Sequence, residues 1–398
     1  MNTAGTVGTV GPIAAEAARL FESAYGRTAG GVWAAPGRVN VIGEHTDYNE
    51  GFVLPMAIDR YTAVAAAPRT DGLLCVVSAA GDHRVTEIAL SDLAPRVPHG
   101  WPAYPAGVAW ALRGAGVLPS RFGGADLAFA STVPIGAGLS SSAALECSTG
   151  MALAAIADAE VRLSPAELAR LSQYAENVYA GVPCGPLDQL SSVFGAEGGV
   201  LFIDTRSLEI AVHPFDLAVA ELTLLVIDTG VSHDLGESGY PARRASCEKA
   251  AAVLGVQALR DLTTADLDRA AAQLDETTAR RVRHVVTENE RVERFVSLLK
   301  LGELTGPRLN AAGELLTASH ASLRDDFEVS CDELDVVVDT ALRAGAHGAR
   351  MTGGGFGGSA IALVSLDRAE RVTASVLDAL PEAEIFQAVP ARGAHRVA

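Results

Sequence analysis

The chain has 398 residues and a formal net charge of −17, with 49% hydrophobic and 20% charged residues. This length exceeds what one ordinary hydrophobic core organises, so the sequence predicts two domains. The hydrophobic content excludes a disordered chain, and the acidic balance excludes nucleic acid or an anionic membrane as the main partner, because both need a basic surface.

The five cysteines are odd in number and lie far apart, without a Cys-x-x-Cys pair or a zinc-ligand spacing. This usage is typical of a reduced protein, so we expect a cytoplasmic location. No apolar run approaches the roughly 18 residues of a membrane span. The first cation after the start is Arg19, so the charged region of a secretory signal is not expected.

Hydrophobic periodicity predicts the elements of the first half in chain order. An amphipathic helix over 14–25 begins the series, and a long apolar helix opens near Ser141 and continues through 151–156. Ser164 and Glu167 form a capping box that predicts another helix, ending at about Tyr179. Strands are predicted near 31–35, 51–66, 73–79 and 125–131.

In the second half a buried strand is expected over 222–227, followed by a mostly helical stretch over 243–318. Strands over 359–364 and 385–389 complete the pattern. The change from strand-rich to helix-rich sequence predicts a boundary near residue 210, which gives domains over 1–210 and 211–398.

The segment 134–144, Pro-Ile-Gly-Ala-Gly-Leu-Ser-Ser-Ser-Ala-Ala, lies between a predicted strand and a predicted helix. Gly136 and Gly138 allow the backbone to approach a ligand closely. Free N–H groups and the positive dipole end of a helix make a phosphate cradle there. The lysine of the common P-loop is missing, and a glycine turn with a serine cap is the alternative. The expected phosphate-binding serines are Ser140, Ser141 and Ser142.

The segment 37–49 concentrates charge among apolar residues. Such groups are costly near a core unless they are paired or used. Two carboxylates, an imidazole and an asparagine suit the vicinal hydroxyls of a sugar, whereas a salt-bridged turn or a metal site are the alternatives. The charged residues of this segment are Arg38, Glu44, His45 and Asp47.

Two further glycine-containing segments are candidates for a ligand site. A loop over 181–189 with two prolines and two glycines brings Asp188 to the start of a short helix, where an aspartate is often only an N-cap. Glu176, 12 residues upstream, is a second acid that suits Mg²⁺. The segment 351–358 holds five glycines in six residues, which indicates either a tight hairpin or a loop pressed against a ligand.

These four segments together resemble the GHMP small-molecule kinases, and within them the galactokinases. Segment 37–49 is similar to the galactokinase signature, and segments 134–144 and 351–358 are similar to the two motifs general to the superfamily. Shorter stretches of similarity are 101–108, 239–244 and 319–330.

The resemblance implies an α+β fold with the two-domain GHMP kinase architecture. The N-terminal domain would be ribosomal-S5-like, a mixed sheet with helices on one face. The C-terminal domain would be a ferredoxin-like α+β layer on an antiparallel sheet, and the active site would lie in the cleft between the two.

Residue roles follow from the same resemblance. Arg38 and Asp188 would be the catalytic pair, Ser142 and Glu176 would lie near Mg²⁺, and Trp101 would be a wall of the adenine pocket. The galactose pocket would be lined by Glu44, His45, Asp47, Gly185 and Tyr240.

The implied reaction moves the γ-phosphoryl group of ATP onto the C1 hydroxyl of galactose, and Asp188 either accepts the hydroxyl proton or only orients the sugar. A monomer is expected. The alternatives are a related kinase for N-acetylgalactosamine or arabinose, and a regulator that senses galactose and ATP without turnover. The complete serine loop favours an enzyme. A Rossmann dehydrogenase is excluded, because no Gly-x-Gly-x-x-Gly follows the first strand.

Overall fold

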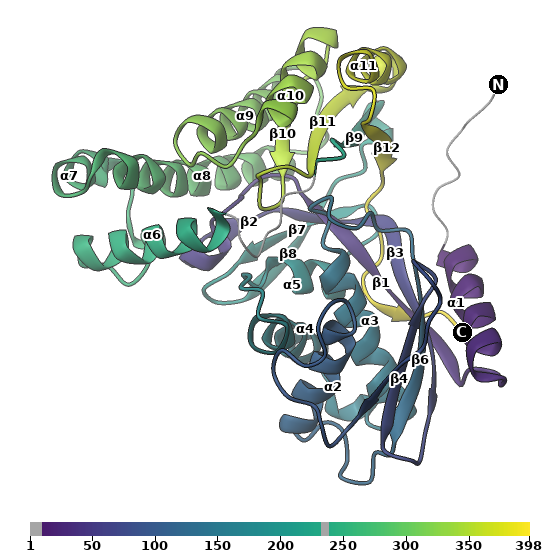
Figure 1. Ribbon diagram of the computed structural model, residues 1–398. Coiled ribbons are helices and arrows are strands. Elements are labelled where there is room, and N and C mark those ends of the chain that lie inside the picture. Colours follow the sequence, from purple (N-terminus) through teal and green to yellow (C-terminus); the bar gives the residue numbers. More distant parts are fainter. Residues whose placement is uncertain (1–9, 232–238) are drawn as a thin grey trace.

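The computed structural model describes residues 10–231 and 239–398. It contains a six-stranded sheet, a four-stranded sheet and a three-stranded sheet, with helices packed around them (Figure 1). The six-stranded sheet has the order β13-β1-β3-β6-β4-β5, and only the β4–β6 pair in it is parallel. Its strands are β1 (Gly31–Asn40), β3 (Pro55–Pro68), β4 (Leu73–Ser78), β5 (Thr86–Ala89), β6 (Gly124–Ser131) and β13 (His395–Arg396).

Helices cover both faces of the six-stranded sheet. The helix α1 packs on one face through Ala17 and Phe21, whereas α2, α3 and α4 form a core on the other face around Trp33 and Leu153. Figure 1 shows α1 across the sheet from α2 and α3. The helices of this region are α1 (Val10–Tyr25), α2 (Ala103–Gly114), α3 (Ser141–Ile156), α4 (Pro165–Tyr174) and α5 (Leu187–Phe194).

The predicted covering of only one face of this sheet is therefore wrong. The reason lies in β3, where alternate side chains point to opposite faces. Ala63 and Ala65 contribute to the α1 side, and Val64 and Ala66 contribute to the other side. Because both sets are apolar, each face needs a covering layer.

The three-stranded sheet has the order β2-β7-β8 and is antiparallel throughout. Its strands are β2 (Phe52–Val53), β7 (Gly199–Asp204) and β8 (Glu209–Pro214). The predicted domain boundary near residue 210 falls inside β8 (Glu209–Pro214), and the bounds 1–210 and 211–398 stay a prediction.

The four-stranded sheet is antiparallel with the order β10-β11-β9-β12. Its strands are β9 (Leu222–Asp228), β10 (Gly348–Thr352), β11 (Ser359–Ser365) and β12 (Glu384–Ala388). The helices around it are α6 (Gly239–Leu254), α7 (Leu267–Gln273), α8 (Glu276–Lys300), α9 (Pro307–Asp325), α10 (Asp332–Ala344) and α11 (Leu366–Ala379).

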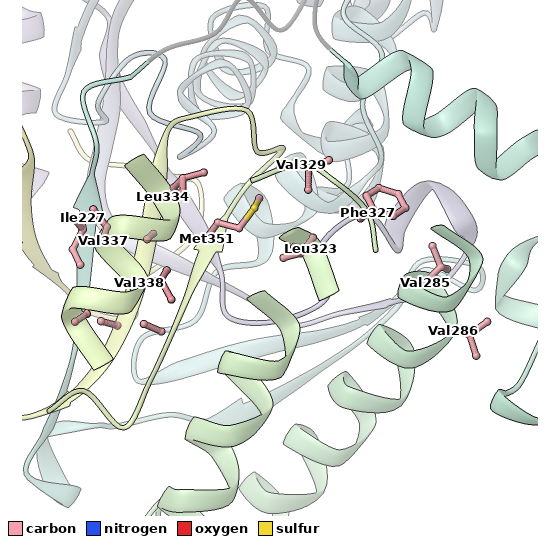
Figure 2. Packing of buried hydrophobic residues seen from close by; sticks show 14 of the residues in the cluster. Ile227, Val285, Val286, Leu323, Phe327, Val329, Leu334, Val337, Val338 and Met351 are labelled. Atoms are coloured by element: carbon pink, nitrogen blue, oxygen red, sulfur yellow. The ribbon is translucent and has the colours of Figure 1, made fainter. Parts of the chain in front are cut away.

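Each face of the four-stranded sheet has its own core. On one face Ile227 and Met351 pack with α10 residues Val337 and Val338 (Figure 2). On the other face Val226 and Ile361 join a cluster that also holds β3 residues and α8 residues. Because this second core is shared by the six-stranded and four-stranded sheets, it fixes the position of one sheet relative to the other.

The sequence placed most of these elements. The predicted strands at 51–66, 73–79, 125–131, 222–227, 359–364 and 385–389 and the helix at 14–25 are confirmed within a few residues. The helix predicted to reach Tyr179 is α-helical only to Tyr174 and then widens into a π-helical segment, Ala175–Ala180. Among the described residues, no helix has both the length and the apolar character to cross a membrane.

Candidate active site

One cavity of about 1010 Å³ lies where the six-stranded sheet, the α5 region and the loops of the four-stranded sheet meet. All the site residues predicted from the sequence line it, whereas only a few of them are near one another in the chain. They are Arg38, Glu44, His45, Asp47, Trp101, Gly136, Gly138, Ser140, Ser141, Ser142, Glu176, Gly185, Asp188 and Tyr240.

An arginine and an aspartate are paired at the centre of the cavity. Arg38 lies on β1 and is 6% exposed, and Asp188 lies in the first turn of α5. The Arg38 Nε donates to Asp188 Oδ1 at 2.8 Å, and its Nη2 contacts the same oxygen. Its Nη1 donates to the carbonyl of Gly138 at 2.6 Å. Arg38 thus joins Asp188 to the segment before α3, which we call the glycine-serine loop (residues 134–142).

The local backbone explains why Arg38 points there. The pairing of β1 with β3 is irregular between Pro36 and Arg38. At Gly37 a Cβ would lie 2.7 Å from the carbonyl of Leu139, so only glycine permits β1 to approach the loop this closely. The Arg38 N–H then donates to that same carbonyl at 3.0 Å.

The segment after β1 forms a compact loop (residues 41–50), which we call the sugar loop after the ligand that its sequence predicts. Glu44 is 4% exposed. Its carboxylate accepts hydrogen bonds from Asn40 Nδ2 at 2.7 Å, from Thr352 Oγ1 at 3.2 Å and from the Gly353 N–H at 2.7 Å. Burial raises the pKa of Glu44, and the nearby Arg350 guanidinium opposes that shift.

His45 is a neutral member of the sugar loop. Burial, and then the neighbouring His284, lower the pKa of His45 to about 3, so the ring is uncharged near neutral pH. Its Nδ1 lies 2.8 Å from the hydroxyl of Tyr48, and its ring is 5.5 Å from that of Tyr240 and 4.7 Å from that of Phe327. The imidazole is thus held in one orientation by aromatic neighbours from α6 and from the α9–α10 connection.

Asp47 and Gly185 are in direct contact. A Cβ on Gly185 would lie 1.8 Å from Asp47 Oδ2, so the carboxylate occupies the space of the missing side chain. Asp47 Oδ1 accepts the N–H of Tyr48 at 2.9 Å. Burial, and then the nearby Asp188 carboxylate, raise the pKa of Asp47 to about 7.

The glycine-serine loop ends at the N-terminus of α3. Gly136, Gly138 and Ser140 all have positive φ angles, 79°, 72° and 58°, which turn the loop tightly before the helix begins at Ser141. The Oγ of Ser140 is buried without a hydrogen-bond partner in the described part of the chain. An unsatisfied hydroxyl beside free helix N–H groups is what an anionic phosphate would complete.

Glu176 lies on the π-helical segment and is 4% exposed. Its Oε2 accepts from Gln189 Nε2 at 2.6 Å and from the thiol of Cys184 at 3.4 Å, and the Ser142 hydroxyl also hydrogen-bonds to Glu176. Burial, and then Asp188, raise the pKa of Glu176 to about 7. A buried carboxyl beside a serine hydroxyl is the oxygen donor set that Mg²⁺ prefers, so these residues fit the metal.

Aromatic rings line part of the cavity. Trp101 lines it and meets Phe129 edge-on, with the ring centroids 5.8 Å apart. Further lining residues of the cavity are Thr62, Ser78, Ala79, Ala80, Tyr104 and Ser131.

The glycine-rich loop between β10 and β11 closes the cavity from the side of the four-stranded sheet. A Cβ on Gly353 would lie 2.8 Å from the carbonyl of Gly138, and one on Gly358 would lie 3.0 Å from the carbonyl of Ala137. The Ser359 Oγ donates to that Ala137 carbonyl at 2.8 Å. The loop is therefore pressed against the glycine-serine loop, and Gly353 and Gly354 line the cavity.

Sequence reasoning missed two buried charged residues beside the site. Glu146, within the apolar α3, is 0% exposed and accepts from Gln189 Nε2 at 3.0 Å. Arg350, within the buried β10, is also 0% exposed and lies 3.6 Å from Glu44. A lone charge inside an otherwise apolar helix or strand was the available signal, since such a residue is costly unless it is used.

Three family models match separate parts of the chain. The galactokinase galactose-binding signature matches residues 19–68, the GHMP kinases N terminal domain matches 103–196, and the GHMP kinases C terminal matches 296–382. A galactokinase of Streptomyces coelicolor is 52% identical over 99% of this chain and 98% of its own length. The chain belongs to the galactokinase family.

Other members of the galactokinase family agree in sequence and in structure. A Mycobacterium tuberculosis galactokinase is 47% identical over 86% of this chain and 92% of its own. The crystal structure of Lactococcus lactis galactokinase complexed with galactose superposes with a TM-score of 0.88 at 34% identity, covering 96% of this chain and 99% of that one. A Methanococcus jannaschii mevalonate kinase has a TM-score of 0.67 at 17% identity over 91% and 98% of the chains, a likeness of fold alone. The predicted two-domain GHMP fold class is confirmed.

Proposed function

We propose that this chain catalyses transfer of the γ-phosphoryl group of ATP to the C1 hydroxyl of galactose, giving galactose 1-phosphate and ADP. The observation that carries the proposal is the Arg38–Asp188 pair, which stands between the sugar loop and the glycine-serine loop in one cavity. A phosphoryl donor bound at the glycine-serine loop and a sugar bound at the sugar loop would meet at this pair.

Arg38 stabilises the charge of the transferring group. Phosphoryl transfer depends on positioning and on neutralising negative charge more than on covalent chemistry. Arg38 is fixed on two sides, by Asp188 and by the Gly138 carbonyl, so it needs no reorganisation when charge develops. The α3 N-terminus and the unpartnered Ser140 hydroxyl bind the phosphates of ATP.

Asp188 acts on the sugar hydroxyl. Both contacts of Arg38 with this carboxylate are made to Oδ1, so Oδ2 is the oxygen that accepts the C1 hydroxyl proton as general base. Galactose itself is held by Asp47, His45 and Glu44 through its ring hydroxyls, with Tyr240 and Gly185 shaping the pocket wall.

Ser142 and Glu176 would hold the magnesium ion that accompanies ATP. When bound, the ion neutralises phosphate charge during transfer. Within the described ranges, no group of three or more histidine, cysteine, aspartate or glutamate residues could hold a metal by itself. Ser142 and Glu176 would therefore hold the ion together with the bound nucleotide. Trp101 forms the wall against the adenine base.

The test is turnover of purified protein with Mg-ATP and separate sugars: galactose, glucose, N-acetylgalactosamine, arabinose and mannose. Galactose is expected to release ADP together with an equal amount of sugar 1-phosphate. Turnover with N-acetylgalactosamine or arabinose alone would show that the proposed substrate is wrong and that the proposed phosphoryl transfer is right. Binding of galactose and ATP without ADP release would contradict the proposed enzyme and favour a sensing regulator.

The proposed enzyme works as a monomer in the cytoplasm. All five cysteines are free thiols, and three of them, Cys75, Cys147 and Cys247, are buried, which suits a reducing compartment. The cavity needs no second chain, because its lining residues, from the sugar loop, the glycine-serine loop, the glycine-rich loop and the α5 region, all belong to one molecule. Size-exclusion chromatography with light scattering, showing one chain per particle, is the expected result.

A further inference from the structure

A fully buried guanidinium lies beneath the sugar loop. Arg350 stands in the middle of β10, whose five residues are all buried. Its neighbours Ala349 and Met351 join the core on the α10 side of the sheet. Because side chains alternate along a strand, Arg350 points to the opposite side, where β1 ends.

The partners of Arg350 all belong to the end of β1 and the start of the sugar loop. Its Nη1 donates to the carbonyls of Asn40 at 2.9 Å and Val41 at 3.2 Å, and it lies 3.6 Å from Glu44 Oε1. Its Nε and Nη2 have no hydrogen-bond partner among the described residues. Glu44 is therefore the carboxylate that compensates this buried charge.

A second buried carboxylate nearby is already committed to other groups. Glu288 on α8 is 2.6 Å from Arg291 Nε and also accepts from Ser319 Oγ at 2.6 Å and from the Gly43 N–H at 2.9 Å. Arg291 neutralises it directly. The charge of Arg350 is thus left to act mainly on Glu44.

Glu44 passes this restraint on to the glycine-rich loop. The oxygen that faces Arg350, Oε1, also accepts the N–H of Gly353 at 2.7 Å. Gly353 in turn packs against the carbonyl of Gly138, and that carbonyl accepts Nη1 of Arg38. Contacts therefore run without a break from Arg350 to the catalytic pair.

We propose that Arg350 is a positioning residue of the transfer reaction, which holds the Glu44 carboxylate in place and so keeps the sugar loop aligned with the glycine-rich loop. Arg350 touches neither substrate and acts through Glu44. The inference rests on the proposed function, in that the sugar bound by this loop is galactose.

Replacing the arginine by an apolar side chain of similar length isolates its charge. In Arg350→Met the Glu44 carboxylate loses its cation, and a displacement of about 1 Å at a positioning group costs about 10²-fold in rate. We expect kcat/KM for galactose to fall by about 10²-fold while the KM for MgATP changes less than about threefold. In Arg350→Lys the charge remains, but on a shorter and more flexible side chain that places it differently, so the expected loss is smaller, about tenfold.

A double variant tests whether the effect passes through Glu44. Once Glu44→Gln has removed the carboxylate, adding Arg350→Met is expected to cause little further loss in kcat/KM for galactose, because interacting residues are not additive. Removing both charges also avoids a buried unpaired ion, so the double variant folds even where Arg350→Met does not. Losses that multiply in the double variant would overturn the proposal.

The matched control is Val338→Ala, which weakens the core on the other side of β10 without touching a charge. It is expected to lower Tm and to leave the galactose constants unchanged. An equal loss of kcat/KM in this control, or wild-type galactose constants in Arg350→Lys, would contradict the role of the guanidinium. Wild-type protein is assayed beside each variant: failure of the wild type to phosphorylate galactose refutes the proposed function, whereas the variant-to-wild-type ratio decides on Arg350.

Discussion

Gly185→Ala is the substitution whose effect can be worked out most directly from the structure. The new Cβ would lie 1.8 Å from Asp47 Oδ2 and 2.3 Å from Asp47 Cγ, whereas real contacts of a Cβ are essentially never under 3.0 Å. The backbone at Gly185 does not have a positive φ, so the conflict is with the Asp47 side chain alone. The Asp47 carboxylate must therefore retreat by about 1 Å, a shift at a positioning group that costs about 10²-fold.

The expected result is a fall of about 10²-fold in kcat/KM for galactose, with the KM for MgATP nearly unchanged. Steady-state kinetics with each substrate varied in turn measures both. Overpacking also lowers the free energy of unfolding by about 1–3 kcal/mol, which thermal denaturation detects.

Two further variants test whether the loss of activity comes from the contact with Asp47 or from a general disturbance of the fold. Gly114→Ala adds a Cβ where nothing lies within 4 Å, so it is expected to leave both KM values unchanged. In Asp47→Ala/Gly185→Ala the obstructing carboxylate is gone, so the double variant is expected to be no worse than Asp47→Ala alone. Wild-type galactose kinetics in Gly185→Ala would refute the geometry that places Asp47 against Gly185.

Three other predictions concern the acids of the cavity. Asp188→Asn should still bind both substrates, measured by calorimetry, but should lose turnover by at least about 10²-fold, and near-normal turnover would remove Asp188 from its role. Asp47 binds hydroxyls as an anion and its pKa is raised to about 7, so kcat/KM for galactose should fall as the pH drops through about 7. The pKa of Glu176 is also raised to about 7, so the profile is measured at saturating Mg²⁺ and ATP, where loss of a metal ligand has the least effect. Asp47→Asn should then abolish this acidic limb, and a limb that persists would assign it to another group. Glu176→Gln should raise the Mg²⁺ concentration needed for half-maximal rate by about tenfold without changing the KM for galactose, and an unchanged Mg²⁺ requirement would exclude Glu176 as a ligand.

The sequence was sufficient wherever a local pattern carried the information. Gly138 and the serines after it predicted a turn into a helix N-terminus, and the structure places the start of α3 at Ser141. The apolar run Leu222 to Ile227 predicted the buried strand β9. The predicted residues of the cavity depended on a resemblance as well, because no local rule brings Asp188 to Arg38 across 150 positions.

Three features could not be predicted, each for a physical reason. The packing of α1 on one face of the six-stranded sheet involves small residues of β3 such as Ala63 and Ala65. Small apolar residues pack equally well against a helix or against another sheet, so they do not show which element covers that face. The widening of the helix after Tyr174 could not be predicted from the capping box, since a capping box specifies only where a helix begins. The partners of Arg350 and Glu146 could not be predicted, because they lie far away in the chain, although the lone charges themselves were a signal.

The central claim is that the phosphoryl group reaches the C1 oxygen of galactose at the Arg38–Asp188 pair. The most direct measurement is ³¹P NMR of the wild-type reaction with Mg-ATP and galactose labelled with ¹³C at C1, run beside Asp188→Asn. The account predicts one new phosphorus signal that couples to the labelled carbon, grows in step with ADP, and is nearly absent in the variant. A product whose phosphorus shows no coupling to C1, or equal product from Asp188→Asn, would contradict it.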